Sequence, residues 1–168
     1  MPLPLAGTVG GMTTSLDIST LDASRALLAG MPSPERVREL EDHLAKLPQI
    51  ALPTSHLVHG GMYARTVFIP AGTVLTGAQT LQDNVCVMHG GITVTTDDGP
   101  QVLEGFHVLP AVAGSKRAGV AHLDTWWTTL WTTDLEDVSA IEESLTHEAD
   151  RLQTLVDPTP RQRGLRPV

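Results

Sequence analysis

Short runs of alternating apolar and polar residues fill the middle of the chain, from about residue 49 to residue 133. The clearest run is 62–69, in which Tyr63 and every second residue after it fall on one face of a strand. Other runs predict strands at 84–89, 91–96, 101–104, 106–109, 119–123 and 125–132, with a hairpin turn at 97–99. Many short strands at this spacing are typical of a β-sandwich or a β-barrel.

Helical periodicity precedes this β-rich region. A short helix is predicted at 21–29, closed by Gly30 in a left-handed conformation. A second helix is predicted after Ser33, an N-cap residue followed by a proline at the first helical position. Its apolar residues form one stripe that ends before Pro48, namely Val37, Leu40, Leu44 and Leu47. Such a helix suits packing across one face of a barrel.

A third helix is predicted after the β-rich region, opened by a capping box of Thr133 and Glu136. Its apolar residues recur every three or four positions: Val138, Ile141, Leu145, Ala149, Leu152 and Val156. The helix either packs on its own barrel or pairs with a partner helix in an oligomer, because near-heptad spacing is what interhelical packing requires. We take Val138, Ile141, Leu145 and Leu152 as candidate assembly contacts.

The length of 168 residues and the 41% hydrophobic content fit one domain with appended arms. We expect an extended N-terminal arm with a short helix at 1–32, a helix plus barrel at 33–133, a C-terminal helix at 134–157 and a basic tail at 158–168. The net charge of −8 argues against a nucleic-acid partner. The tail is positively charged, in contrast to the rest of the chain. Its three arginines are further candidate assembly contacts: Arg161, Arg163 and Arg166.

No stretch approaches the roughly 20 apolar residues of a membrane helix, and residues 1–5 do not resemble a signal peptide, so we expect no membrane partner and a cytoplasmic address. Cys86 is the single cysteine, which excludes an internal disulfide and a cysteine-based zinc site. The apolar neighbours of Cys86 indicate that its side chain is buried and acts as a small hydrophobic group. The sequence contains neither a phosphate-binding loop nor a nucleophile elbow.

Three local strings carry a family resemblance: GGMYARTVFIPAGT at 60–73, GSKRAG at 114–119 and DTWWTT at 124–129. Over about residues 34–145 the chain resembles the small cupin-domain proteins encoded in tailed-phage genomes. The resemblance implies a mainly β fold, a cupin-like double-stranded β-helix (jelly-roll barrel) with flanking helices and extended termini. It does not imply the chemistry of those relatives.

In the relatives, two histidines four residues apart and a third at the end of the last barrel strand hold a metal. The resemblance places Thr80, Asn84 and Trp131 at these positions. Neutral hydroxyl and amide oxygens bind transition metals weakly, and an indole nitrogen only donates. We therefore expect no metal and no cofactor, and no catalytic residue can be assembled.

Two other residue sets leave alternatives open. A metal site could be rebuilt from relocated histidines, namely His56, His59, His89, His107 and His122. Alternatively, a metal-free pocket could be walled by Tyr63, Arg65, Trp127 and Trp131, since the two tryptophans share one strand face and Trp126 lies on the other. Arg65, Lys116 and Arg117 could hold an anion there, although solvated or ion-paired roles are the commoner ones.

The leading hypothesis is a non-catalytic phage structural or assembly protein, a virion component that docks through its arms and C-terminal helix. Its expected partners are copies of itself and other phage structural proteins, with the host cytoplasm as the site of assembly. The alternatives are a metal-dependent small-molecule enzyme of the oxygenase or isomerase type, and a metal-free ligand-binding module.

Overall fold

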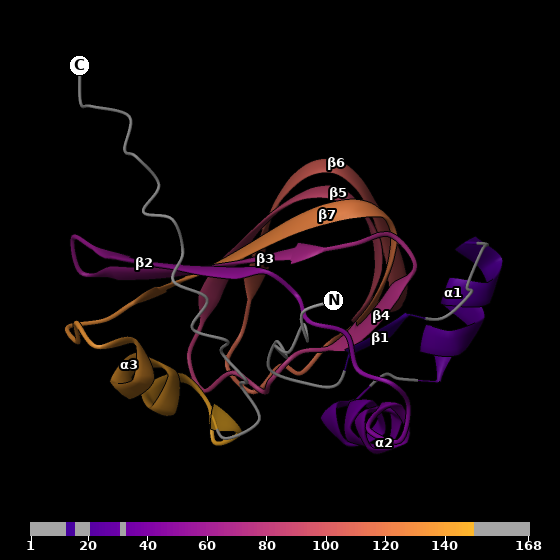
Figure 1. The fold of residues 1–168 in the computed structure, drawn as a ribbon, viewed down its shortest axis with the longest axis horizontal. Helices are drawn as coiled ribbons and strands as arrows, with labels where there is room; N and C mark the ends of the chain where they lie inside the picture. Colours follow the sequence, from indigo (N-terminus) through magenta and orange to yellow (C-terminus); the bar gives the residue numbers. More distant parts are fainter. Residues whose placement is uncertain (1–12, 16–20, 31–32, 150–168) are drawn as a thin grey trace, which may run out of the picture.

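The computed structural model describes residues 13–15, 21–30 and 33–149, and these form a mainly antiparallel β structure with helices outside it (Figure 1). The strands are β1 Thr13–Ser15, β2 Thr54–His59, β3 Met62–Ile69, β4 Thr73–Thr76, β5 Asn84–Thr96, β6 Gly99–Ala111 and β7 Ala118–Thr132. The helices are α1 Leu21–Ala29, α2 Pro34–Leu44 and α3 Val138–Leu145. No helix among these described residues is long and apolar enough to cross a membrane.

The strand β7 organises the sheet because it pairs with three others. One edge of β7 pairs with β5 along most of its length, and β5 in turn pairs with β6. The other edge pairs with β4 at Val120 and its neighbours and then with β3 from Thr125 to Thr132. A strand that changes partner along its length curls the sheet, and Figure 1 shows β5, β6 and β7 arching together above β3 and β4. The result is the predicted antiparallel barrel.

The strands are longer than their alternation predicts. The runs 84–89 and 91–96 form one strand, and its register shifts at Gly90 and Gly91. Gly90 has φ +144°, and a Cβ at this position would lie 2.5 Å from the Asp124 carbonyl oxygen. Only glycine fits such a bulge. In the sequence, the glycines interrupt the alternation and therefore predict a break between two strands. The same fusion of short predicted strands produces β6 and β7, while β1, β2 and β4 were not predicted as strands.

The two N-terminal helices are confirmed. The hydroxyl of Ser33 accepts a hydrogen bond from the Arg36 amide at 3.5 Å, and Pro34 begins α2. The helices cover one part of the barrel with an apolar cluster made of Leu28, Val37, Leu40, Leu44, Val74, Ala118 and Val120. Gly30 is not among the glycines with positive φ, so the predicted left-handed cap of α1 is wrong.

The C-terminal helix differs from its prediction at both ends. Asp137 is the N-cap and accepts from the Ala140 amide at 3.0 Å, so the predicted capping box is wrong. The helix ends at Leu145, because the Leu145 carbonyl accepts from the Leu81 amide at 2.8 Å and Thr146 is extended. The seam therefore does not form one helix from Val138 to Val156. Several of the predicted assembly contacts lie outside the described residues: Leu152, Arg161, Arg163 and Arg166.

The described part of the seam packs inward. Ile141 and Leu145 are buried at 0% and 4% exposure and pack against Tyr63 of β3, with Val138 partly buried beside them. The assembly role predicted for Ile141 and Leu145 is therefore corrected to a core role, since a side chain buried in its own chain offers no surface to a partner. The alternative in which α3 packs on its own barrel is the one the structure shows.

Candidate functional site

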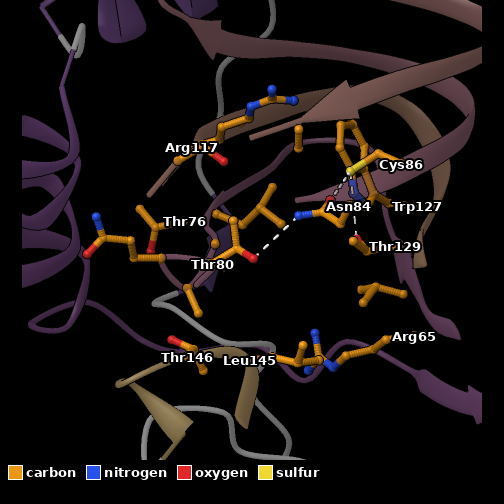
Figure 2. A pocket seen from close by; sticks show the side chains of 18 of the residues that line it. Arg65, Thr76, Thr80, Asn84, Cys86, Arg117, Trp127, Thr129, Leu145 and Thr146 are labelled. Carbon is orange, nitrogen blue, oxygen red and sulfur yellow. Dashed lines mark hydrogen bonds between the residues drawn. The ribbon is translucent and has the colours of Figure 1, made fainter. Parts of the chain in front are cut away.

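A cavity of about 190 Å³ lies inside the barrel (Figure 2). Inward-facing residues of β3, β5 and β7 form its walls, and the loop at 77–80 and the end of α3 close parts of it. The four predicted cavity-lining residues, Tyr63, Arg65, Trp127 and Trp131, all line it. Because alternate residues of a strand face opposite ways, the other side of β7 turns Trp126 outward, where it is 51% exposed and packs on Phe68.

The three positions that the resemblance assigns to metal ligands meet in this cavity. Asn84 Nδ2 and Trp131 Nε1 each lie 3.4 Å from Thr80 Oγ1 and donate to it. Thr80 in turn donates to the Gln82 carbonyl at 2.8 Å. Cys86 is buried beside Asn84, and its sulfur lies 3.5 Å from Asn84 Oδ1. We call Thr80, Asn84 and Trp131 the Thr80 cluster; its polar atoms satisfy one another.

The Thr80 cluster does not fit a metal ion. Its side chains present a hydroxyl whose proton is engaged, an amide and a donor-only indole, in place of three imidazoles. Within the described part of the chain, no group of three or more His, Cys, Asp or Glu residues could hold a metal. The three positions therefore converge in the cavity, but their side chains supply no strong metal donor.

The five histidines considered for a relocated site are not brought together. His56 lies next to Tyr63, while His59 and His89 are exposed. His107 contacts the Glu104 carbonyl at 2.9 Å, and His122 contacts Thr93 at 3.2 Å. Each has its own surroundings on a different part of the sheet. The geometry gives no support to a site rebuilt from these residues.

A charged cluster lies at another end of the cavity, where β2 and β3 meet α3. Arg65 Nε lies 3.4 Å from Glu142 Oε1, and both side chains are 10% exposed. Tyr63 donates from its hydroxyl to the same Glu142 oxygen at 3.2 Å, and His56 Nδ1 lies 2.7 Å from that hydroxyl. We call His56, Tyr63, Arg65 and Glu142 the Arg65 cluster. Glu142 could not be predicted from the sequence as a member of this cluster, because an acid within a helical segment is usually solvated.

Burial dominates the electrostatics of the Arg65 cluster. Desolvation raises the pKa of Tyr63 well above its ordinary value, and the neighbouring Glu142 carboxylate raises it further. Desolvation also lowers the pKa of His56, against the opposing influence of Glu142 and with a smaller contribution from Arg65. Tyr63 is thus a neutral hydrogen-bond donor, and burial favours the neutral form of His56.

The Arg65 cluster is not fully satisfied. Among the described residues, Arg65 Nε and Nη2 and His56 Nε2 are buried and have no hydrogen-bond partner. Nε approaches Glu142 within ion-pair distance but without hydrogen-bond geometry. A buried guanidinium normally uses its donors, so unused ones call for an explanation.

The predicted basic set separates into different environments. Arg117 lines the cavity and donates to the Pro110 carbonyl at 3.4 Å. Lys116 does not line it: its side chain is fully buried and its ammonium lies 3.1 Å from Glu41 and 2.8 Å from Glu148. Lys116 therefore has an ion-paired role, which is the commoner one for such a residue.

Comparison with known proteins gives structural likenesses only. No protein-family model and no curated protein matches the sequence. The solved structures similar to this chain include a cupin superfamily protein of Desulfitobacterium hafniense (15% identity, 55% of this chain and 86% of that one, TM-score 0.43). Another is KdgF from Halomonas sp. (18%, 51% and 82%, TM-score 0.43). An RmlC-like cupin family protein of Methanocaldococcus jannaschii with a double-stranded β-helix fold is also similar (11%, 49% and 81%, TM-score 0.41).

The predicted fold class is confirmed. The chain is mainly β and forms an antiparallel barrel with helices at its flanks, as the jelly-roll prediction requires.

Proposed function

We propose that this chain is a non-catalytic cupin-like barrel that serves as a structural or assembly protein. One observation carries the proposal: at the three positions that the resemblance assigns to metal ligands, the polar side-chain atoms are engaged in hydrogen bonds with one another and with the Gln82 carbonyl. A metal would have to displace a satisfied hydrogen-bonded set and would gain no strong donor in return. The resemblance to phage-encoded cupins gives the proposal its specific form, a component of the virion.

The outer face of the barrel supplies a surface for assembly. The register of β6, β5, β7, β3 and β2 aligns outward-facing residues in three rows. The rows are Phe106, His89, Trp126 and Phe68; Val108, Val87, Thr128, Thr66 and Ser55; and Pro110, Val85, Leu130, Ala64 and Leu57. Phe106, Val108 and Leu57 are 66%, 57% and 62% exposed. We call this surface the bare sheet face.

The bare sheet face suits a second copy of this chain. None of the residues in its rows is an acid, a lysine or an arginine, although the chain carries a net charge of −8. Two copies meeting through this face would avoid the repulsion between their acidic surfaces while removing large apolar side chains from water. The proposed contact surface is therefore the sheet, and it replaces the Ile141 and Leu145 contacts predicted on α3.

Restoring the ligands tests the non-catalytic part of the proposal. The triple variant Thr80→His, Asn84→His, Trp131→His should acquire a transition metal, because these three positions converge in the cavity. The wild-type chain and the single variant Trp131→His should contain none after purification without chelators. Elemental analysis makes the measurement, and one equivalent of metal in the wild type would overturn the proposal.

Light scattering tests the assembly part. Val108→Asp places a carboxylate in the middle row of the bare sheet face, at its β6 end, and should shift the chain toward the monomer. Val112→Asp is the matched control, since Val112 is also exposed, at 61%, but lies outside the rows. A wild type that is monomeric at all concentrations would contradict self-association. Mass spectrometry of purified virions would then test the chain's place in a particle.

A further inference from the structure

We propose that the Arg65 end of the cavity binds the carboxylate of a small organic acid, with the apolar body of that acid lying against Trp127 and Trp131. The proposal goes beyond the assembly role and does not depend on it. Its basis is a cation, nine-tenths buried in the wall of an apolar cavity, whose Nε and Nη2 have no hydrogen-bond partner among the described residues.

The guanidinium of Arg65 has unused capacity. It carries five N–H donors, and the ion pair between Nε and Glu142, at 3.4 Å, lacks hydrogen-bond geometry. Nη2 is buried with no acceptor among the described residues. Burying a charge without satisfying its donors is costly, so an incoming acceptor at this point recovers free energy that the empty site lacks. A carboxylate matches the planar fork of the guanidinium.

The apolar body of the ligand is defined by the neighbours of Arg65. In the pairing of β3 with β7, Arg65 lies opposite Thr129, and Tyr63 and Val67 beside it lie opposite Trp131 and Trp127. Arg65 is thus flanked by two indoles on the adjacent strand. Trp131 also stacks on Tyr63 with ring centroids 5.7 Å apart. Further lining residues are aliphatic: Ile69, Leu75, Ile92 and Val94.

The cavity volume sets the size of the acid. A dry apolar cavity of about 150 Å³ is sufficient for benzene. The cavity of about 190 Å³ in this chain therefore accommodates one aromatic or branched aliphatic group with its carboxylate. Figure 2 shows Arg65 and Arg117 at opposite sides of the cavity. Arg117 has a backbone acceptor at Pro110, so the unsatisfied donors mark Arg65 as the anion-binding end.

Benzoate is a suitable probe, titrated into the purified full-length chain and followed by tryptophan fluorescence and by calorimetry. We expect saturable binding with a change in indole emission, because the ring lies against Trp127 and Trp131. Benzamide has the same shape without the charge and should bind about tenfold more weakly or not at all. Inorganic phosphate, an anion without an apolar body, should not compete at equal concentration.

Variants identify the cation. Arg65→Met should weaken benzoate binding about tenfold or more, whereas Arg117→Met, which removes the arginine at the opposite side of the cavity, should leave the affinity within about twofold. Arg65→Lys retains the charge but loses the planar guanidinium, and it should also weaken benzoate binding. This variant replaces Arg65→Met in the test if Arg65→Met does not fold. Glu142→Gln should strengthen binding, because it removes the competing carboxylate and can still accept from Tyr63.

Three results would overturn the proposal. They are the absence of benzoate binding at millimolar concentration, equal binding of benzoate and benzamide, and equal affinity in Arg65→Lys and wild type. Each is distinct from the tests of assembly, because the cavity faces the barrel interior and the bare sheet face lies outside.

Discussion

The barrel contains two buried basic residues with acidic partners, and they differ in how completely they are satisfied. Lys116 lies 3.1 Å from Glu41 and 2.8 Å from Glu148, and Glu148 also accepts from the Gln79 amide. Arg65 has one carboxylate at 3.4 Å and buried nitrogens without acceptors among the described residues. Burial alone would raise the pKa of Glu148, but its hydrogen bonds from Lys116 and Gln79 hold it below its ordinary value.

The difference separates a structural charge from an available one. Lys116 connects α2 with the segment after α3, and neither its ammonium nor Glu41 reaches solvent. Arg65 instead lines the cavity, and its partner Glu142 is shared with Tyr63. A fully paired buried ion contributes to the uniqueness of the fold, whereas an incompletely paired one retains capacity for a ligand.

Removing Lys116 should have the largest effect on stability. Lys116→Met leaves Glu41 buried without its cation, which typically costs about 3–5 kcal/mol in the free energy of unfolding. Lys46→Met, at an exposed lysine just after α2, is the matched control and should change stability by less than about 0.5 kcal/mol. Urea denaturation followed by circular dichroism measures both. Similar stabilities of the two variants would contradict the structural role of Lys116.

Removing the shared acceptor of the Thr80 cluster should have an intermediate effect. Thr80→Val retains the shape of the side chain but leaves Asn84 Nδ2 and Trp131 Nε1 without this acceptor, at a cost of about 1–3 kcal/mol. Thr80→Ser retains the hydroxyl and is the control. Urea denaturation that finds Thr80→Val as stable as Thr80→Ser would mean that the cluster contributes nothing to stability.

Removing Arg65 should cost less than removing Lys116, by the same measurement. Arg65→Met loses the contact with Glu142, but it also relieves the desolvation of unpaired nitrogens, and Tyr63 still donates to Glu142. We expect a loss of about 1–2 kcal/mol. A loss equal to that of Lys116→Met would show that the two ion pairs do not differ, and would remove the basis of the comparison.

The smallest effect concerns pH. Burial lowers the pKa of His56 below its ordinary 6.5, so between its folded-state pKa and 6.5 the unfolded chain binds a proton that the folded chain does not. The free energy of unfolding should therefore fall as the pH drops below about 6.5. His122, whose pKa burial also lowers, contributes in the same direction. Denaturation of His56→Gln at several pH values should show a shallower decline, and an unchanged slope would contradict it.

Local patterns in the sequence determined most of the elements. The stripe of Val37, Leu40 and Leu44 with the Ser33 cap predicted α2, and alternation predicted β3, because both depend on residues a few positions apart. The strand ends were less predictable. Gly90 looks like a break in the sequence, yet in the barrel it is the bulge that allows β5 to pass close to β7.

The family resemblance also placed part of the site. It grouped Thr80, Asn84 and Trp131, which the structure brings within hydrogen-bonding distance. Alternation on β3 and β7 put Tyr63, Arg65, Trp127 and Trp131 on inner faces, where they line the cavity. These residues could be predicted because their direction follows from strand period and from the order of strands in the barrel.

Only the tertiary structure decided which charges are paired and where α3 ends. Glu142 pairs with Arg65 on β3, and Lys116 pairs with Glu41 on α2. The partners in each pair are far apart in the sequence, so no local pattern predicts the pairing. The apolar seam after Asp137 continues in the sequence, but the Leu145 carbonyl bonds to Leu81 and the helix stops. Periodicity fixes which way a side chain points, whereas closure of the barrel determines what it meets.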